Sequence, residues 1–131
     1  MELTWKYVTE VSDKDAFDKF AKEYGMEVPE NIQSFVLKTN AGCPSKYQID
    51  DINGNTRVFG GVLSYNREDD DKIYSKMRRW ESKHYLPFGL DPFGNLYCVH
   101  ILIGTIVWWN HETNQFVHIA DSLEEMLEKL Y

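Results

Sequence analysis

The stretch from Leu86 to Ile119 consists of four short runs of β-branched and aromatic residues, with a turn between each run and the next. The runs cover residues 86–90, 95–103, 106–110 and 115–119. Such composition is typical of strands on a pleated, half-buried surface, and the short gaps let consecutive strands pair as hairpins. The stretch therefore predicts a four-stranded antiparallel meander around which the rest of the chain is organised.

The gaps between these runs carry different turn residues. In the first gap, Pro92 presets φ and Gly94 accepts a positive φ. In the second, Gly104-Thr105 places glycine where a two-residue type II′ hairpin needs it. In the third, we expect a four-residue turn in which Asn114 adopts the left-handed conformation.

The run at 95–103 has two apolar faces, because alternate side chains of a strand point in opposite directions. One face carries Tyr97, Val99, Ile101 and Ile103, and the other carries Leu96, Cys98, His100 and Leu102. Neither face is mainly polar. We therefore expect both faces to be at least partly covered, one of them by helices.

Helical signals lie on either side of the predicted meander. Ser12 is expected to cap a helix that ends at Gly25, and Pro29 to open a second helix. A third helix is predicted from about residue 71 to 83, with the acidic residues before it as its cap, and a capping box at 122–125 opens a fourth.

Two strands are expected between the second and third helices. Tyr47, Ile49 and Ile52 indicate a short edge strand, and residues 57–65 indicate another, with Gly60 placing a bulge or a close backbone approach in it. Helices segregated around a mostly antiparallel sheet give an α+β fold, and the absence of linkers or repeats predicts one domain spanning residues 1–131.

The overall charge restricts the possible partners. The net charge is −7 with a pI near 5.0, which argues against binding to a phosphate backbone. No apolar run resembles a signal peptide or a membrane span, so we expect a cytoplasmic protein without membrane contact. Cys43 and Cys98 are far apart in sequence, and we expect both to be free thiols, Cys98 being buried.

The residues that most often carry chemistry do not form a convincing site. Four histidines are present without metal-ligand spacing, and Gln115 stands where a zincin motif beginning at His111 needs a second histidine. Cys98 and His100 share a strand face but lie inside a strand. Residues 50–55 are similar to a calcium loop but lack its distal glutamate, which favours a solvated turn. We therefore expect no catalytic residues, no metal and no cofactor.

Two surface features are candidate sites for binding another protein. The first is the run Glu68, Asp69, Asp70 and Asp71, which suits a basic partner and equally suits a helix N-terminus. The second is the pair Trp108 and Trp109, followed by Glu112. Adjacent strand residues face opposite ways, so one tryptophan is expected in the core and the other outside as a possible interface anchor.

Taken together, the motifs resemble those of the SUKH superfamily, which includes fungal cell-wall assembly regulators and many bacterial immunity proteins. The matching segments are residues 28–32 with 40–42, 59–63, 86–96, 106–112 and 120–127. Ala41 and Gly89 depart from the family pattern, which has glycine and alanine there. The resemblance rests on the order and spacing of the segments, since each segment alone consists mostly of residues typical of turns and of the ends of helices and strands.

The resemblance implies an α+β fold without a catalytic site and a role in binding proteins. Bacterial members neutralise toxins by direct binding, and an acidic inhibitor suits a basic nuclease toxin. The first hypothesis is therefore an immunity protein for such a polymorphic toxin. The alternative is a regulatory scaffold that binds signalling proteins, and a third hypothesis is a small hydrolase that uses Cys98 and His100.

Overall fold

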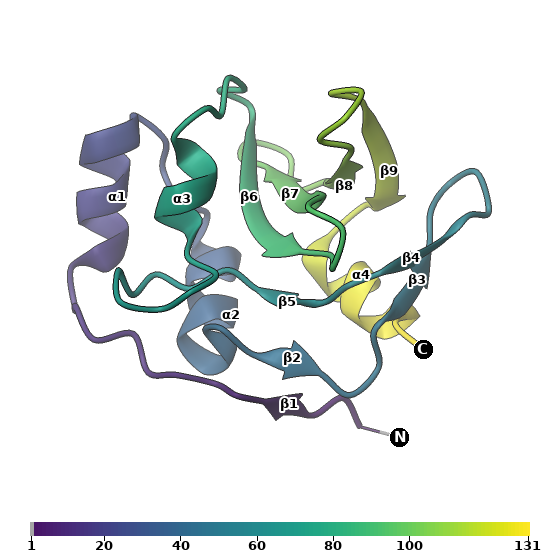
Figure 1. Ribbon diagram of the computed structural model, residues 1–131, viewed down its shortest axis with the longest axis horizontal. Helices are drawn as coiled ribbons and strands as arrows, with labels where there is room; N and C mark the ends of the chain where they lie inside the picture. Colours follow the sequence, from purple (N-terminus) through teal and green to yellow (C-terminus); the bar gives the residue numbers. More distant parts are fainter. Residues whose placement is uncertain (1) are drawn as a thin grey trace.

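The computed structural model describes residues 2–131, so Met1, the first residue of the predicted domain, lies outside the described residues. The helices are α1 (Ala16–Tyr24), α2 (Glu30–Thr39), α3 (Ile73–Met77) and α4 (Leu123–Lys129). The strands are β1 (Trp5–Lys6), β2 (Cys43–Pro44), β3 (Gln48–Asp50), β4 (Thr56–Val58), β5 (Gly61–Val62), β6 (Tyr85–Leu90), β7 (Leu96–His100), β8 (Ile106–Trp109) and β9 (Phe116–Ala120). Helices combined with antiparallel sheets confirm the predicted α+β fold (Figure 1).

Five strands form one antiparallel sheet in the order β5-β6-β7-β8-β9. Its last four strands follow one another along the chain, which confirms the predicted meander. Two small ladders pair β1 with β2 and β3 with β4. The β3–β4 hairpin lies beside α4 (Figure 1).

One face of the five-stranded sheet is covered by helices and by an aromatic core. The ring of Phe59 packs against Tyr97 of β7 and Phe88 of β6, with centroids 5.0 and 6.1 Å apart. Phe35 of α2 packs in turn on Phe88 and on Trp5 of β1. These contacts join α2 and the N-terminal strand to the sheet.

The other face is covered mainly by aromatic side chains that meet across it. Tyr85 pairs with His100 at one end of the sheet, and Phe116 pairs with Trp109 at the other end. Their rings nevertheless stack with centroids 4.7 Å apart, because a strong twist brings diagonal corners together. The ring of Trp80 packs edge-on against Trp109 and completes the cover. Both faces are thus partly covered, as expected.

The turns of the meander correct one prediction and confirm another. The β7–β8 turn has four residues, 101–104, closed by the His100 amide donating to the Thr105 carbonyl at 2.8 Å. Gly104 takes a φ of +82° as the last of these residues, so the predicted type II′ hairpin is wrong and β7 ends before Ile101. The β8–β9 turn has the same pattern with Asn114 at a φ of +60°, as predicted.

The predicted strand at 57–65 is divided into β4 and β5, which belong to different sheets. The break covers Phe59 and Gly60, and the amide of Gly60 donates to the carbonyl of Leu90 at 2.7 Å. The close backbone approach expected at this glycine is therefore present. Gly89 has a related role, because a Cβ there would lie 2.4 Å from the ring of Phe59. An alanine at this position would displace that core ring.

The predicted N-terminal caps of two helices, α1 and α3, are wrong. Ser12 does not cap α1, because its amide and hydroxyl donate to Asn66 Oδ1, and α1 begins after Asp15. The N-cap position of α3 is Lys72, so the acidic run does not cap that helix. By contrast, Ser122 Oγ accepts the Glu125 amide at 3.1 Å and caps α4 as predicted.

The third helix is also shorter than predicted, since α3 ends at Met77 and not near residue 83. The chain turns there, and the indole nitrogen of Trp80 donates to the carbonyl of Tyr85 at 2.8 Å. A tertiary contact of Trp80 with Trp109 across the sheet face therefore takes precedence over helical periodicity.

Candidate protein-binding surfaces

The acidic run lies along one side of a small cleft of about 250 Å³, here called the acidic cleft. The cleft is lined by residues 69–71 together with Thr9, Ala41, Val62 and Leu90. Its lining thus combines carboxylates with small or aliphatic residues. Glu68 lies outside this cleft and lines a neighbouring one beside α1.

Asp69 differs from the rest of the run because its carboxylate has several partners inside the protein. Its Oδ2 accepts hydrogen bonds from the hydroxyls of Ser64 and Thr9 and from the side-chain amide of Asn66. The hydrogen bond from Ser64 is the largest cause that lowers the pKa of Asp69 below its ordinary value, and the hydrogen bonds from Thr9 and Asn66 lower it further. Asp69 therefore ties the N-terminal arm to the segment after β5, which is a structural role.

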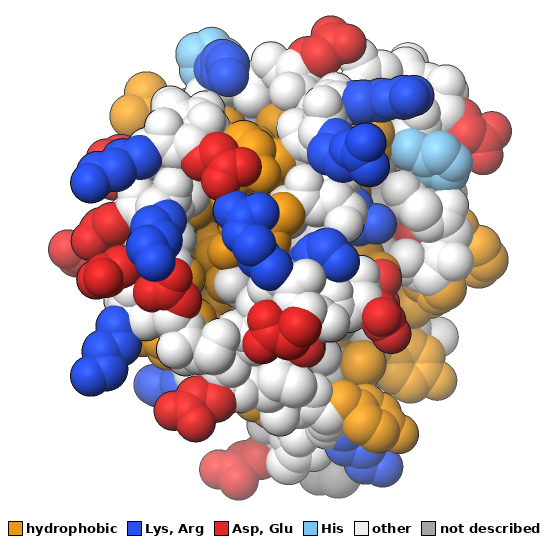
Figure 2. Space-filling model, turned by 60° about the vertical axis from the view of Figure 1, so that its left-hand side comes forward, with side chains coloured by type: hydrophobic (Ala, Val, Ile, Leu, Met, Phe, Trp, Pro, Cys, Tyr) orange, Lys and Arg blue, Asp and Glu red, His pale blue; other side chains and the backbone are white. Residues whose placement is uncertain are grey.

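Asp70 and Asp71 are exposed and remain candidates for contact with a partner. The surrounding surface is not uniformly acidic. On the face that carries α1, acidic and basic side chains are interspersed (Figure 2). Two of the basic residues there are already paired, Lys19 with Asp13 and Arg67 with Glu23. Any acidic docking site in this region is therefore local to the acidic cleft.

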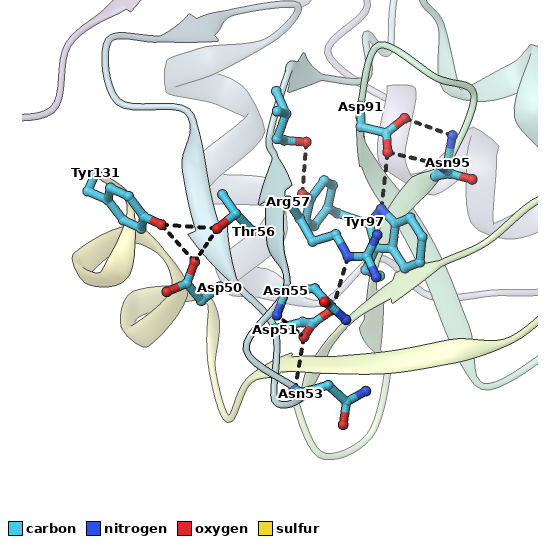
Figure 3. Close-up of polar contacts among 12 residues, drawn as sticks. Asp50, Asp51, Asn53, Asn55, Thr56, Arg57, Asp91, Asn95, Tyr97 and Tyr131 are labelled. Carbon is cyan, nitrogen blue, oxygen red and sulfur yellow. Dashed lines mark hydrogen bonds and ion pairs between the residues drawn. The ribbon is translucent and has the colours of Figure 1, made fainter.

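Trp108 is the inward member of the tryptophan pair, with an exposed fraction of 4%. Its indole nitrogen donates to Asp91 Oδ2 at 3.1 Å, and the guanidinium of Arg57 lies 3.8 Å from its ring centroid. Arg57 Nε in turn donates to Asp51 Oδ2 at 3.0 Å. We call Asp51, Arg57, Asp91 and Trp108 the Trp108 cluster, and Figure 3 shows its Asp51, Arg57 and Asp91 side chains. The burial of Trp108 makes it a core residue.

The two aspartates of the Trp108 cluster stand at the same place in two similar loops. Asp51 opens residues 51–55 and Asp91 opens 91–95, both with the pattern Asp-x-x-Gly-Asn. The Oδ1 atom of each aspartate accepts hydrogen bonds from the backbone amides two and four residues further on. Each loop also has a glycine at positive φ. Asp51 is 5% exposed, so the expected solvated turn is wrong at this residue.

Trp109 is the outward member and lines a second cleft of about 360 Å³, the Trp109 cleft. The other residues that line this cleft are Arg79, Trp80, Glu81, Ser82, His111, Asn114 and Phe116. Trp80 packs on Trp109 with ring centroids 5.1 Å apart and on Phe116 at 6.2 Å. Phe116 keeps 38% of its surface exposed, so aromatic faces are accessible here. Clustered tryptophan, phenylalanine and arginine side chains are typical of interface hot spots.

The structure therefore separates the predicted site residues into different surroundings. Residues 69–71 and Trp109 line different clefts, and Trp108 belongs to the core. Glu112 is exposed in the β8–β9 turn, where its amide donates to Asn110 Oδ1. Arg79 and Phe116 were not predicted as neighbours of Trp109. The basic segment before β6 is unusual in the sequence, but no local pattern places it or Phe116 beside Trp109.

The geometry does not favour the hydrolase hypothesis. Cys98 is fully buried, and burial raises the pKa of its thiol well above the ordinary value, which disfavours a nucleophilic thiolate. His100 Nδ1 accepts hydrogen bonds from the backbone amides of Leu102 and Ile103 in the β7–β8 turn. Within residues 2–131, His, Cys, Asp and Glu form no group of three that could hold a metal ion.

A family model described as SMI1 / KNR4 family (SUKH-1) matches residues 12–129. Because the match covers most of the chain, the protein belongs to this family, and the resemblance seen in the motifs is confirmed. No curated protein matches the sequence. Within residues 2–131, none of the helices is long and apolar enough to cross a membrane.

Proposed function

We propose that this chain is an immunity protein that binds a toxin domain and blocks it by direct contact, in the cytoplasm and without a catalytic step. Membership of the SUKH-1 family supports a protein-binding role. The net charge of −7 suits a basic partner, such as a nuclease whose groove attracts phosphate. Occupying that groove would exclude the nucleic acid, so no cofactor or metal is needed.

The observation that carries the proposal is the acidic cleft. Exposed Asp70 and Asp71 lie beside Ala41, Val62 and Leu90, so carboxylates adjoin an aliphatic surface. A lysine or arginine side chain has the matching character, since its stem is aliphatic and its end is cationic. We infer that the toxin inserts such a side chain here.

The proposal requires a toxin domain encoded beside the gene for this chain, and the test uses that domain. Co-expression with this chain should restore the growth of bacteria that produce the toxin, and the purified pair should form a stoichiometric complex. Failure of the toxin domain to bind would overturn the immunity proposal. A signalling protein as the stoichiometric partner in the source cells would support the scaffold alternative.

A pair of charge-matched variants tests the position of the interface. The double variant Asp70→Lys/Asp71→Lys should slow association by at least about tenfold at low salt, with the loss shrinking at high salt. Glu124→Lys/Glu128→Lys changes the net charge equally at exposed positions on α4 and should have a much smaller effect. Equal losses from both variants would mean that overall charge, and not the acidic cleft, guides association.

A further inference from the structure

The segment that crosses from α3 to β6 has the opposite charge to the molecule as a whole. Residues 76–83 contain four cations, Lys76, Arg78, Arg79 and Lys83, and one carboxylate, Glu81. The local charge is therefore +3 in a chain of net charge −7. An acidic chain that concentrates cations in eight residues has a local field unlike that of the rest of its surface.

None of these four cations forms an ion pair within residues 2–131. Some cations elsewhere are paired, since Lys19, Arg67 and Lys129 each contact a carboxylate within 2.9 Å. Arg78, Arg79 and Lys83 are all exposed. Their charges are therefore available to a partner without breaking any internal ion pair.

The Trp109 cleft lies directly against this basic segment, because Arg79 and Trp80 belong to both. Its aromatic walls are fixed in place by hydrogen bonds. Trp80 Nε1 donates to the Tyr85 carbonyl at 2.8 Å, and Trp109 Nε1 donates to Asn114 Oδ1 at 2.7 Å. Because both indole N–H groups are already used, the rings offer apolar faces, and charge recognition falls to the surrounding segment, in which four cations outnumber the one carboxylate, Glu81.

We infer that the Trp109 cleft binds an acidic segment of a partner protein, with one apolar side chain seated against Trp109 and Phe116 and flanking carboxylates paired with Arg79 and Lys83. A volume of about 360 Å³ accommodates one or two side chains and not a folded surface. The net charge of −7 disfavours a nucleic acid, whose phosphates extend well beyond the basic segment. This surface is separate from the acidic cleft and does not depend on the proposed toxin.

The experiment pans a random twelve-residue peptide library against the folded protein, with the variant Arg79→Glu/Lys83→Glu as counter-selection. The expected peptides carry aspartate or glutamate around one large apolar residue. One of them, made synthetically, should bind at least about tenfold more weakly to Arg79→Glu/Lys83→Glu by fluorescence anisotropy. The matched control Lys14→Glu/Lys22→Glu reverses two exposed cations on or beside α1 and should keep affinity within about threefold at 150 mM salt, where distant charges are screened.

A second readout locates the peptide on the protein. The indole N–H resonances of Trp80 and Trp109 should shift on titration, while that of buried Trp108 should not. Enriched peptides without acidic residues, or equal binding by both charge variants, would overturn the inference. The inference would also be overturned if the protein associated with itself and Arg79→Glu/Lys83→Glu abolished that association. The Trp109 cleft would then bind a second copy of this chain. Stronger binding of a single-stranded oligonucleotide than of the peptide would overturn it in favour of nucleic acid.

Discussion

Trp108 and Trp109 are neighbours on β8, but they belong to regions of opposite character. Around Trp108, the indole nitrogen, the Arg57 guanidinium and the carboxylates of Asp51 and Asp91 all have partners inside the protein. Around Trp109, the rings are partly exposed, and Arg79 forms no ion pair with any of the described residues 2–131. Polar groups that are paired with each other join the elements of the fold, whereas groups left unpaired at a cleft remain available for recognition.

The largest expected effect comes from truncating the inward tryptophan. Trp108→Ala should lower the free energy of unfolding by about 3–5 kcal/mol, because it leaves a cavity and removes partners of Arg57 and Asp91. Trp109→Ala is the matched control and should cost about 1 kcal/mol, since its site is already open to solvent. Urea denaturation measures both, and equal losses would contradict the division into core and interface tryptophans.

The second effect concerns the two arginines that each combine an ion pair with a ring contact. Arg57 pairs with Asp51, whose side chain is fully buried, while Arg67 pairs with the half-exposed Glu23 and lies over Tyr74. Arg57→Ala should cost about 1–3 kcal/mol because a buried carboxylate loses its cation. Arg67→Ala should cost less than about 1 kcal/mol, since exposed pairs contribute little. Chemical denaturation of both variants distinguishes a closed cluster from a surface pair.

The same contrast occurs within the acidic run and predicts a dependence on pH. The pKa of Asp69 is lowered in the folded state, chiefly by the Ser64 hydroxyl, so its contribution to stability is present above its unfolded pKa and is lost as pH falls through the folded pKa. Asp69→Asn should cost about 1 kcal/mol at pH 7 and less near pH 2. Exposed Asp70→Asn should change stability little at either pH. Urea titrations at the two values provide the check, and a pH-independent loss for Asp69→Asn would refute the linkage.

Local pattern in the sequence was sufficient for the meander and for the division of the tryptophan pair. Alternation along a strand requires that Trp108 and Trp109 face opposite sides, and turn composition correctly gave Asn114 a positive φ. The order of the elements followed from the same local signals along the chain. These features depend on residues close together in the chain, which is why they could be predicted.

Contacts between distant residues account for what could not be predicted. Trp80 leaves the helical pattern to pack on Trp109, twenty-nine positions further along the chain, and Phe116 reaches Tyr85 only because the sheet is twisted. Asp69 looked like a surface carboxylate, but Thr9 folds back to donate to it. No periodicity encodes these contacts, so the Trp109 cleft and the internal role of Asp69 required the structure.

The smallest expected effect concerns backbone strain beside the acidic cleft. Ala41 lines this cleft with a φ of +63°, a conformation that favours glycine. Ala41→Gly should therefore stabilise the fold, by up to about 1 kcal/mol after the greater freedom of glycine in the unfolded chain is subtracted. Gly25→Ala makes the reverse change at a φ of +68°, where an added Cβ would meet nothing within 4 Å, and should destabilise by about 1 kcal/mol. Thermal and urea unfolding of the two variants should shift in opposite directions. If Ala41→Gly instead destabilises, packing of the Ala41 methyl group at the acidic cleft outweighs the strain of its backbone.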